Sequence, residues 1–318
     1  MSVDRRSVWP FRDGEPDTFS YVREAHPTGV EAERRLGDLE RGRALLFSSG
    51  MAAATSILLA LLRPGQVVAL AEGGYFGTEI LMREVLGPWG LESVRFDQTG
   101  APPEGVDLIW LEAPSNPFLT MPDLAAAAAH PGKVVVDSTV ATPVYLNPID
   151  GGADLVLHSA TKYLTGHSDA MAGAVVCRDG ADYDRLFHVR HVTGPVCPAD
   201  TAALVTRGLK TLRVRVERQT ETARVLAARL GAHPAVETVW YPGFSGLLSF
   251  DVAGDPLPVE RATRLIKNAT SLGGVETTME SRHRWEGDRV PVGLLRLSVG
   301  LEDAADLWDD LEQALASA

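Results

Sequence analysis

Short apolar segments alternate with amphipathic stretches between about residues 45 and 180. The apolar segments are rich in valine, leucine and isoleucine and are bounded by glycine, proline or small polar residues, which is typical of buried strands linked by helices. The predicted strands are 67–71, 106–111, 133–137, 155–158 and 172–177. This order of elements predicts an α/β fold built on a large, mostly parallel sheet.

The pattern changes in the last third of the chain. Apolar residues at helical spacing, with arginines on the other face, predict one long helix over about residues 199–230. A smaller α+β unit follows, with strands expected near 236–241, 247–252 and 294–299 and helices near 259–267 and 303–316. We therefore expect a short N-terminal arm (1–40), a large domain (41–230) and a small C-terminal domain (231–318).

Composition narrows the possible partners. A formal net charge of −12 argues against nucleic acid and against an anionic membrane surface, since both need a clustered cationic face. The N-terminus lacks a signal-type apolar core and the longest apolar run, 51–62, is too short to span a bilayer, so we expect a cytoplasmic protein. Cys177 and Cys197 are expected to be inert thiols and not a disulfide or a metal site.

Lysine is rare in this chain, with four lysines against 26 arginines. Lys162 lies just after the apolar segment 154–158 and is flanked by the hydroxyl residues Ser159 and Thr161. Arginine cannot lose its proton and so cannot form a Schiff base, whereas a lysine amine can. The position of Lys162 therefore suggests amine chemistry.

Pyridoxal 5′-phosphate (PLP), the common partner of a Schiff-base lysine, presents a phosphate, a pyridine nitrogen and a ring face. Ser48 and Ser49 precede a predicted helix, so the backbone amides of Gly50 and Met51 would face an anion at its N-terminus. Ser159 and Thr161 can add hydroxyl donors. The alternative is that Ser48 and Ser49 form only a helix cap and turn.

Three further residues could contact the ring. Asp137 ends a buried strand, where a carboxylate needs a partner such as a protonated pyridine nitrogen. Tyr75, in a glycine-rich loop after a strand, could stack on the ring, and Asn116 could donate to the phenolic oxygen. The alternatives are an aspartate that caps a turn, a tyrosine that only packs and an asparagine that forms a turn before proline.

In the C-terminal part, Arg296 lies within an apolar strand and its guanidinium needs an anion. A substrate α-carboxylate bound through two hydrogen bonds would provide one. An internal salt bridge with one of the many acidic residues is the alternative.

Assembled in this order, these segments resemble the Cys/Met-metabolism PLP-dependent family, which includes cystathionine γ-synthases, cystathionine lyases and methionine γ-lyase. The resemblance covers nearly the whole chain. Its segments are 21–23, 47–53, 75–78, 112–117, 137–143, 153–169, 207–212, 271–276 and 296–302. It implies the fold type I architecture, similar to aspartate aminotransferase, with a PLP-binding large domain and a small C-terminal domain.

The resemblance also implies roles for individual residues. Lys162 would form an aldimine with PLP and remove the Cα proton of an amino-acid substrate, and Tyr75 would assist proton transfer. Gly50, Met51, Ser159 and Thr161 would hold the phosphate, Asp137 the pyridine nitrogen and Asn116 the phenolic oxygen. Ser271 and Arg296 would bind the substrate.

In this family, a Tyr-Xaa-Arg pair reaches the phosphate of the neighbouring subunit. Tyr21 and Arg23 therefore imply a homodimer, normally doubled to a homotetramer.

The expected reaction is elimination or replacement at Cβ or Cγ of a sulfur-containing or O-activated amino acid, as in trans-sulfuration. Segment 282–285 and the loops around it are shorter than in relatives or differ from them, which leaves a C–S lyase or γ-replacement enzyme for a bulky amino-acid conjugate as an alternative. A catalytically silent PLP-binding regulatory partner is a second alternative, from another class of protein.

Overall fold

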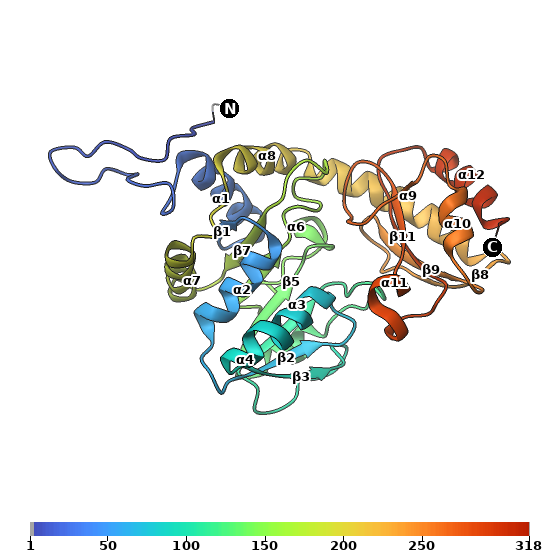
Figure 1. The fold of residues 1–318 in the computed structure, drawn as a ribbon, viewed down its shortest axis with the longest axis horizontal. Helices are drawn as coiled ribbons and strands as arrows, with labels where there is room; N and C mark the ends of the chain where they lie inside the picture. The colour runs from blue at the N-terminus through green and yellow to red at the C-terminus, as the bar shows by residue number, and fades with distance from the viewer. Residues whose placement is uncertain (1–2, 318) are drawn as a thin grey trace.

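A computed structural model describes residues 3–317, which fold around two β-sheets (Figure 1). The first sheet has seven strands in the order β1-β7-β6-β5-β4-β2-β3. Its strands are β1 (Arg43–Phe47), β2 (Val67–Ala71), β3 (Glu92–Phe96), β4 (Leu108–Glu112), β5 (Lys133–Asp137), β6 (Leu155–His158) and β7 (Gly173–Cys177). Pairings among β3, β2, β4, β5 and β6 are parallel, and β7 runs antiparallel to both of its neighbours. The predicted α/β class and mostly parallel sheet are confirmed, although β1 and β3 were not predicted.

Helices cover both faces of this sheet because successive strand residues point to opposite sides. In β1, Leu45 and Phe47 pack on the face covered by α2 and α7, and Leu46 packs on the face covered by α1 and α8. The helices of this part are α1 (Pro27–Glu40), α2 (Gly50–Leu61), α3 (Phe76–Leu81), the π-helical turn η1 (Met82–Leu86), α4 (Gly87–Trp89), α5 (Leu124–Ala128), α6 (Thr142–Tyr145), α7 (Gly180–Thr193), α8 (Ala199–Leu209) and α9 (Leu212–Gly231).

The second sheet has five strands in the order β10-β11-β12-β9-β8, and its core includes residues of α9, α10 and α12 (Figure 1). Its elements are β8 (Val236–Trp240), β9 (Leu247–Val252), α10 (Leu257–Ala262), β10 (Lys267–Asn268), β11 (Thr278–Ser281), α11 (His283–Glu286), the 3₁₀ turn η2 (Gly287–Arg289), β12 (Leu294–Ser298) and α12 (Ala304–Leu315). The sequence pattern predicted β8, β9, β12 and α12 but not β11.

The single helix predicted over 199–230 is wrong, because the chain forms two helices that meet at Lys210 and Thr211. The buried guanidinium of Arg215 stabilises this break. It donates to the carbonyl of Gly208 at 2.8 Å and to that of Tyr163 at 3.0 Å, so it holds the end of α8 against the turn that carries Lys162.

The helix predicted near 259–267 is also wrong beyond Ala262. The carboxylate of Asp310, on α12, accepts hydrogen bonds from the backbone amides of Arg264, Leu265 and Ile266. These bonds replace the helical ones, so the chain runs on in an extended form to β10.

The N-terminal segment before α1 projects away from the rest of the chain (Figure 1). Within it, Trp9 packs against Phe19 with ring centroids 5.6 Å apart, while Val8 and Phe11 are exposed. Among residues 3–317, no helix is both long enough and apolar enough to cross a membrane.

Candidate active site

One cavity of about 290 Å³ lies where the carboxyl ends of the central parallel strands meet the second sheet. The sheet register explains why three of the lining residues lie side by side. Glu112 of β4 is the neighbour of Asp137 of β5, which is the neighbour of Leu157 of β6. Loops that follow parallel strands at this edge are the usual ligand site of α/β sheets. The cavity is lined by Gly50, Met51, Tyr75, Glu112, Asn116, Asp137, Ser159, Thr161, Lys162, Thr270, Ser271, Arg282 and Arg296, among others.

Lys162 lies in the turn after β6, and its amine contacts the loop between β10 and β11. Its Nζ donates a hydrogen bond to Oγ of Ser271 at 2.6 Å. Burial and the nearby Arg296 guanidinium lower the pKa of Lys162 to about 8. About a tenth of the amine is therefore unprotonated at pH 7, far more than at the ordinary lysine pKa of 10.5, and this unprotonated form is the one that acts as nucleophile and general base.

The start of α2 forms a cradle of backbone amides. The Ser49 hydroxyl caps the helix by accepting from the amide of Ala52 at 3.0 Å, as the sequence suggested. The amides of Gly50 and Met51 donate no hydrogen bond within residues 3–317, and both residues line the cavity. A Cβ at Gly50 would lie only 3.0 Å from Cβ of Ser159, so a larger residue would narrow this cradle. Free amides at a helix N-terminus suit a phosphate.

The hydroxyl groups of Ser159 and Thr161, beside Lys162, differ in whether they are free to donate a hydrogen bond to a ligand. Thr161 donates its hydroxyl proton to the carbonyl of Ala172 at 3.1 Å, so that donor is already engaged. Ser159 uses its backbone amide to bind Oγ1 of Thr139 at 2.8 Å, and its hydroxyl has no protein partner in the described chain. Ser159 is therefore the readier phosphate donor of the two.

Asp137 has hydrogen-bond donors but no counter-charge. Its Oδ1 accepts from the amide of Thr139 at 3.0 Å and from the hydroxyl of Thr139 at 2.5 Å. No arginine, lysine or histidine within residues 3–317 forms an ion pair with it. Burial raises the pKa of Asp137, because the carboxylate loses water without gaining a cation. A protonated pyridine nitrogen is the kind of partner that would remove this penalty.

Tyr75 lies at the start of α3, next to a buried carboxyl that the sequence did not single out. Its backbone amide donates to Oε2 of Glu112 at 2.6 Å. Burial and the neighbouring Asp137 raise the pKa of Glu112 well above its usual range, which favours the neutral form. Tyr75 is 39% exposed and lines the cavity, and its ring packs against that of Phe76 with centroids 4.9 Å apart.

Arg296 forms the internal salt bridge that the sequence left as an alternative. Its Nη2 pairs with Glu280 and also donates to the carbonyl of Ser271 at 3.0 Å, while Nη1 donates to Oδ1 of Asn116 at 3.1 Å. Glu280 and Arg296 are direct cross-strand neighbours of β11 and β12. Burial, with the nearby Arg282, lowers the pKa of Arg296 to about 10. The guanidinium still lines the cavity.

Tyr21 and Arg23 do not line the cavity of their own chain. Nη1 of Arg23 donates to the carbonyl of His191 at 2.6 Å, and its guanidinium lies 5.3 Å from the centroid of the Tyr21 ring. The remaining ten predicted site residues all line the one cavity. Within residues 3–317, no group of three or more histidine, cysteine or acidic side chains could hold a metal ion.

The sheet, the buried lysine and the amide cradle define the fold type I class of PLP enzymes. A model of the family "Cys/Met metabolism PLP-dependent enzyme" matches residues 3–316, and the chain belongs to this family. It is therefore a PLP-dependent enzyme. The residues fit that cofactor: the amides of Gly50 and Met51 for the phosphate, Asp137 for the ring nitrogen and Lys162 for the carbonyl carbon.

Individual relatives cover most of the chain. It is 37% identical to the L-methionine γ-lyase of Pseudomonas deceptionensis, over 95% of this chain and 86% of that one. It is 38% identical to the cystathionine γ-synthase of Mycobacterium bovis, over 93% of this chain and 86% of that one. The crystal structure of cystathionine γ-lyase from Lactobacillus plantarum, complexed with L-serine, matches with a TM-score of 0.95 and 30% identity, over 99% and 93% of the two chains.

Proposed function

We propose that this enzyme catalyses elimination or replacement at Cβ or Cγ of a sulfur-containing or O-activated amino acid. The relatives named as methionine γ-lyase, cystathionine γ-synthase and cystathionine γ-lyase support this reaction class. The observation that carries the proposal is the Lys162 amine, which is held at 2.6 Å by Ser271 and has a pKa of about 8. An amine in this state can accept a proton from carbon and return it elsewhere on the substrate.

Different residues of the cavity bind the substrate, remove its proton and position the amine. PLP, when bound, withdraws electrons from the substrate Cα and so makes its proton easier to remove. Arg296, held by Asn116, binds the α-carboxylate, and Lys162 takes the proton from Cα. Ser271 accepts a hydrogen bond from the amine and so keeps it between the cofactor end and the substrate end of the cavity.

Tyr75 also lines the cavity and lies at the start of helix α3, which follows β2 of the first sheet. Its backbone is fixed by Glu112 and its ring is partly exposed to the cavity. We assign its hydroxyl to proton transfer at the departing sulfur or oxygen atom, and its ring to stacking on the cofactor.

A screen of amino-acid substrates tests this assignment. The purified holoenzyme is incubated with cystathionine, methionine, cysteine, O-activated homoserines and larger S-conjugates, each with and without an added thiol, and the products are identified by mass spectrometry. A keto acid with release of a thiol indicates elimination, and a new thioether indicates replacement. Turnover of none of these substrates would overturn the proposal, and turnover of S-conjugates alone would favour the bulky-substrate alternative.

We further propose a homodimer as the minimal unit, doubled to a homotetramer, in which Tyr21 and Arg23 complete the partner subunit's phosphate site. Tyr21 is 43% exposed and belongs to the segment that projects from the body of the chain (Figure 1). Mixing Arg23→Ala with Lys162→Ala tests the dimer. A hybrid regains activity if one of its sites holds both native residues, and no recovery from a proven hybrid would contradict the assignment. The two buried, unpaired cysteines agree with the cytoplasmic location that we propose.

A further inference from the structure

Four buried charges meet at the substrate end of the cavity. We call Glu280, Arg282, Glu286 and Arg296 the charge cluster; their side chains are only 4–6% exposed. Two of the four, Arg282 and Arg296, also line the cavity. Buried charges are costly unless each has a partner, so the way they share partners determines how much charge the cavity presents.

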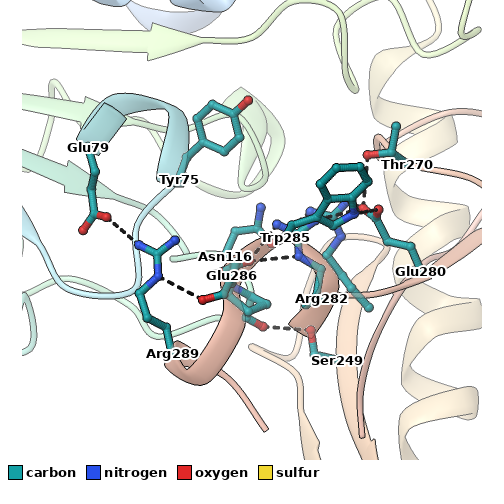
Figure 2. Close-up of polar contacts among 12 residues, drawn as sticks. Tyr75, Glu79, Asn116, Ser249, Thr270, Glu280, Arg282, Trp285, Glu286 and Arg289 are labelled. Carbon is teal, nitrogen blue, oxygen red and sulfur yellow. Dashed lines mark hydrogen bonds and ion pairs between the residues drawn. The ribbon is translucent and has the colours of Figure 1, made fainter. Parts of the chain in front are cut away.

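Glu280 is shared between the two arginines. Its Oε1 pairs with Nη2 of Arg296 and accepts from Nη1 of Arg282 at 2.9 Å. Figure 2 shows the same carboxylate beside Thr270 and Trp285, which donate to it at 3.2 Å and 3.1 Å. These four donors, three on Oε1 and one on Oε2, hold the Glu280 carboxylate in place.

Arg282 has a second carboxylate. Its Nε and Nη2 donate to Oε1 of Glu286 at 2.9 Å and 2.7 Å, one helical turn along the chain. The cluster therefore holds two cations and two anions. Glu112, a cavity-lining carboxyl of β4, adds little negative charge here, because burial and Asp137 raise its pKa well above the usual range.

This sharing matters for Arg296. A carboxylate paired with Arg296 alone would neutralise it and compete with an incoming substrate carboxylate. A carboxylate shared with a second guanidinium leaves part of the positive charge of Arg296 uncompensated.

We propose that Arg282 is a positioning residue for substrate binding: by sharing Glu280, it keeps the guanidinium of Arg296 available to the substrate α-carboxylate. Glu280 fixes the direction of that guanidinium, and Arg282 limits how far Glu280 neutralises it. The inference rests on the proposed role of Arg296 in carboxylate binding. It predicts that removing Glu280 and removing Arg282 change carboxylate affinity in opposite directions, which a purely structural salt bridge does not predict.

The test measures binding of propionate to the holoenzyme by isothermal titration calorimetry. Propionate has a carboxylate but no amine, so it cannot react with the cofactor. Propionamide, of the same size but uncharged, is the control ligand. Arg282→Gln should weaken propionate binding about tenfold, and Glu280→Gln should strengthen it about fivefold to tenfold. The double variant has one cation and one anion and should return to within about threefold of the native protein.

Two further variants separate charge from folding. Arg282→Lys keeps the cation and should keep propionate affinity within about threefold. Arg284→Gln removes the arginine within α11, which pairs with Glu260 outside the cluster, and should leave propionate affinity unchanged. Melting temperatures of all variants show any loss of stability. If Arg282→Gln does not fold, Glu280→Gln, which has the same shape as the native residue, and Arg282→Lys still decide the question.

Opposite changes in the two single variants support the inference. Weaker propionate binding in both, or no change in either, overturns it. Because propionate binding does not depend on turnover, a holoenzyme that shows the opposite changes but converts no amino acid would overturn the proposed reaction and leave this inference intact.

Discussion

The two ends of the cavity differ in whether their charged and polar groups have partners within the chain. At the cofactor end, Asp137 has Thr139 as a hydrogen-bond donor but no cation, and the amides of Gly50 and Met51 have no acceptor in the described chain. At the substrate end, each charge of the cluster already has an oppositely charged partner within the chain, although Arg282 and Arg296 share the carboxylate of Glu280. A cofactor that stays bound can complete a site that is unbalanced without it. A substrate that leaves in every cycle needs a site that is stable both with and without it.

The largest effect is expected where the two ends meet, at Lys162. Lys162→Ala should lower turnover by about a thousandfold or more, because it removes both the nucleophile for the cofactor and the base for Cα. Lys267→Ala is the matched control. Lys267 is exposed, and in the described chain its one ion pair is with Glu276, at 3.7 Å. Turnover is measured on the best substrate of the screen, and the visible spectrum of the bound cofactor is recorded in parallel. A Lys162→Ala enzyme that keeps a tenth of native turnover would contradict the assignment.

A smaller effect is expected at the substrate end. Arg296→Gln should lower kcat/KM by about a hundredfold, chiefly through KM, because the substrate carboxylate loses its cation. The variant should still bind the cofactor and absorb visible light, which distinguishes this site from Lys162. Arg213→Gln, on the exposed face of α9, is the control. Loss of the visible absorbance with native KM would place Arg296 at the cofactor end.

The pH dependence of cofactor capture measures how strongly the two ends are coupled. The pKa of Lys162 is lowered to about 8, so the amine is protonated and unreactive below that pH. The rate at which cofactor-free protein takes up PLP should fall about tenfold for each pH unit below 8 and level off above it. The Glu280 carboxylate raises the pKa of Lys162, so Glu280→Gln should move the inflection to lower pH. The rate is followed by stopped-flow absorbance, and an unchanged inflection in Glu280→Gln would mean that the ends are electrically independent.

The same division explains what the sequence could predict. The cofactor end is built from short local segments, each a strand followed by a loop, so Gly50, Asp137 and Lys162 could each be placed at a strand end or a helix start. Their meeting in one cavity follows from the parallel order of the strands. Local patterns were therefore enough to place these three residues.

The substrate end depends on contacts that local patterns do not contain. Glu280 meets Arg296 only because β11 and β12 pair in one particular register, across the segment 282–293 that contains α11 and η2. Strand β11 has too few residues to show a clear alternation, so its register could not be predicted. Thr161 is a similar case, because its hydroxyl is engaged by the backbone of Ala172, 11 residues further along the chain.

The smallest effect is expected from Asp137, and it concerns stability. Burial raises the pKa of Asp137 above its ordinary value of 3.8, so the folded cofactor-free protein binds this proton more tightly than the unfolded chain does. Its stability therefore falls as pH rises above 3.8, until the carboxyl is ionised in the folded protein as well. Asp137→Asn removes this penalty and should raise the free energy of unfolding of the cofactor-free protein by about 1 kcal/mol at pH 7.

With PLP bound, the native protein should be more stable than Asp137→Asn, because only the native carboxylate can form an ion pair with a protonated ring nitrogen. Thermal unfolding with and without PLP checks both halves, with Asp38→Asn as an exposed control that should change stability by less than about 0.5 kcal/mol. If Asp137→Asn lowers stability equally in both states, Asp137 is a structural residue held by Thr139. If Asp137→Asn is the more stable protein without PLP and the less stable one with PLP, the difference between the two ends of the cavity is seen in a single carboxyl. The charge of Asp137 then destabilises the cofactor-free protein and stabilises the holoenzyme.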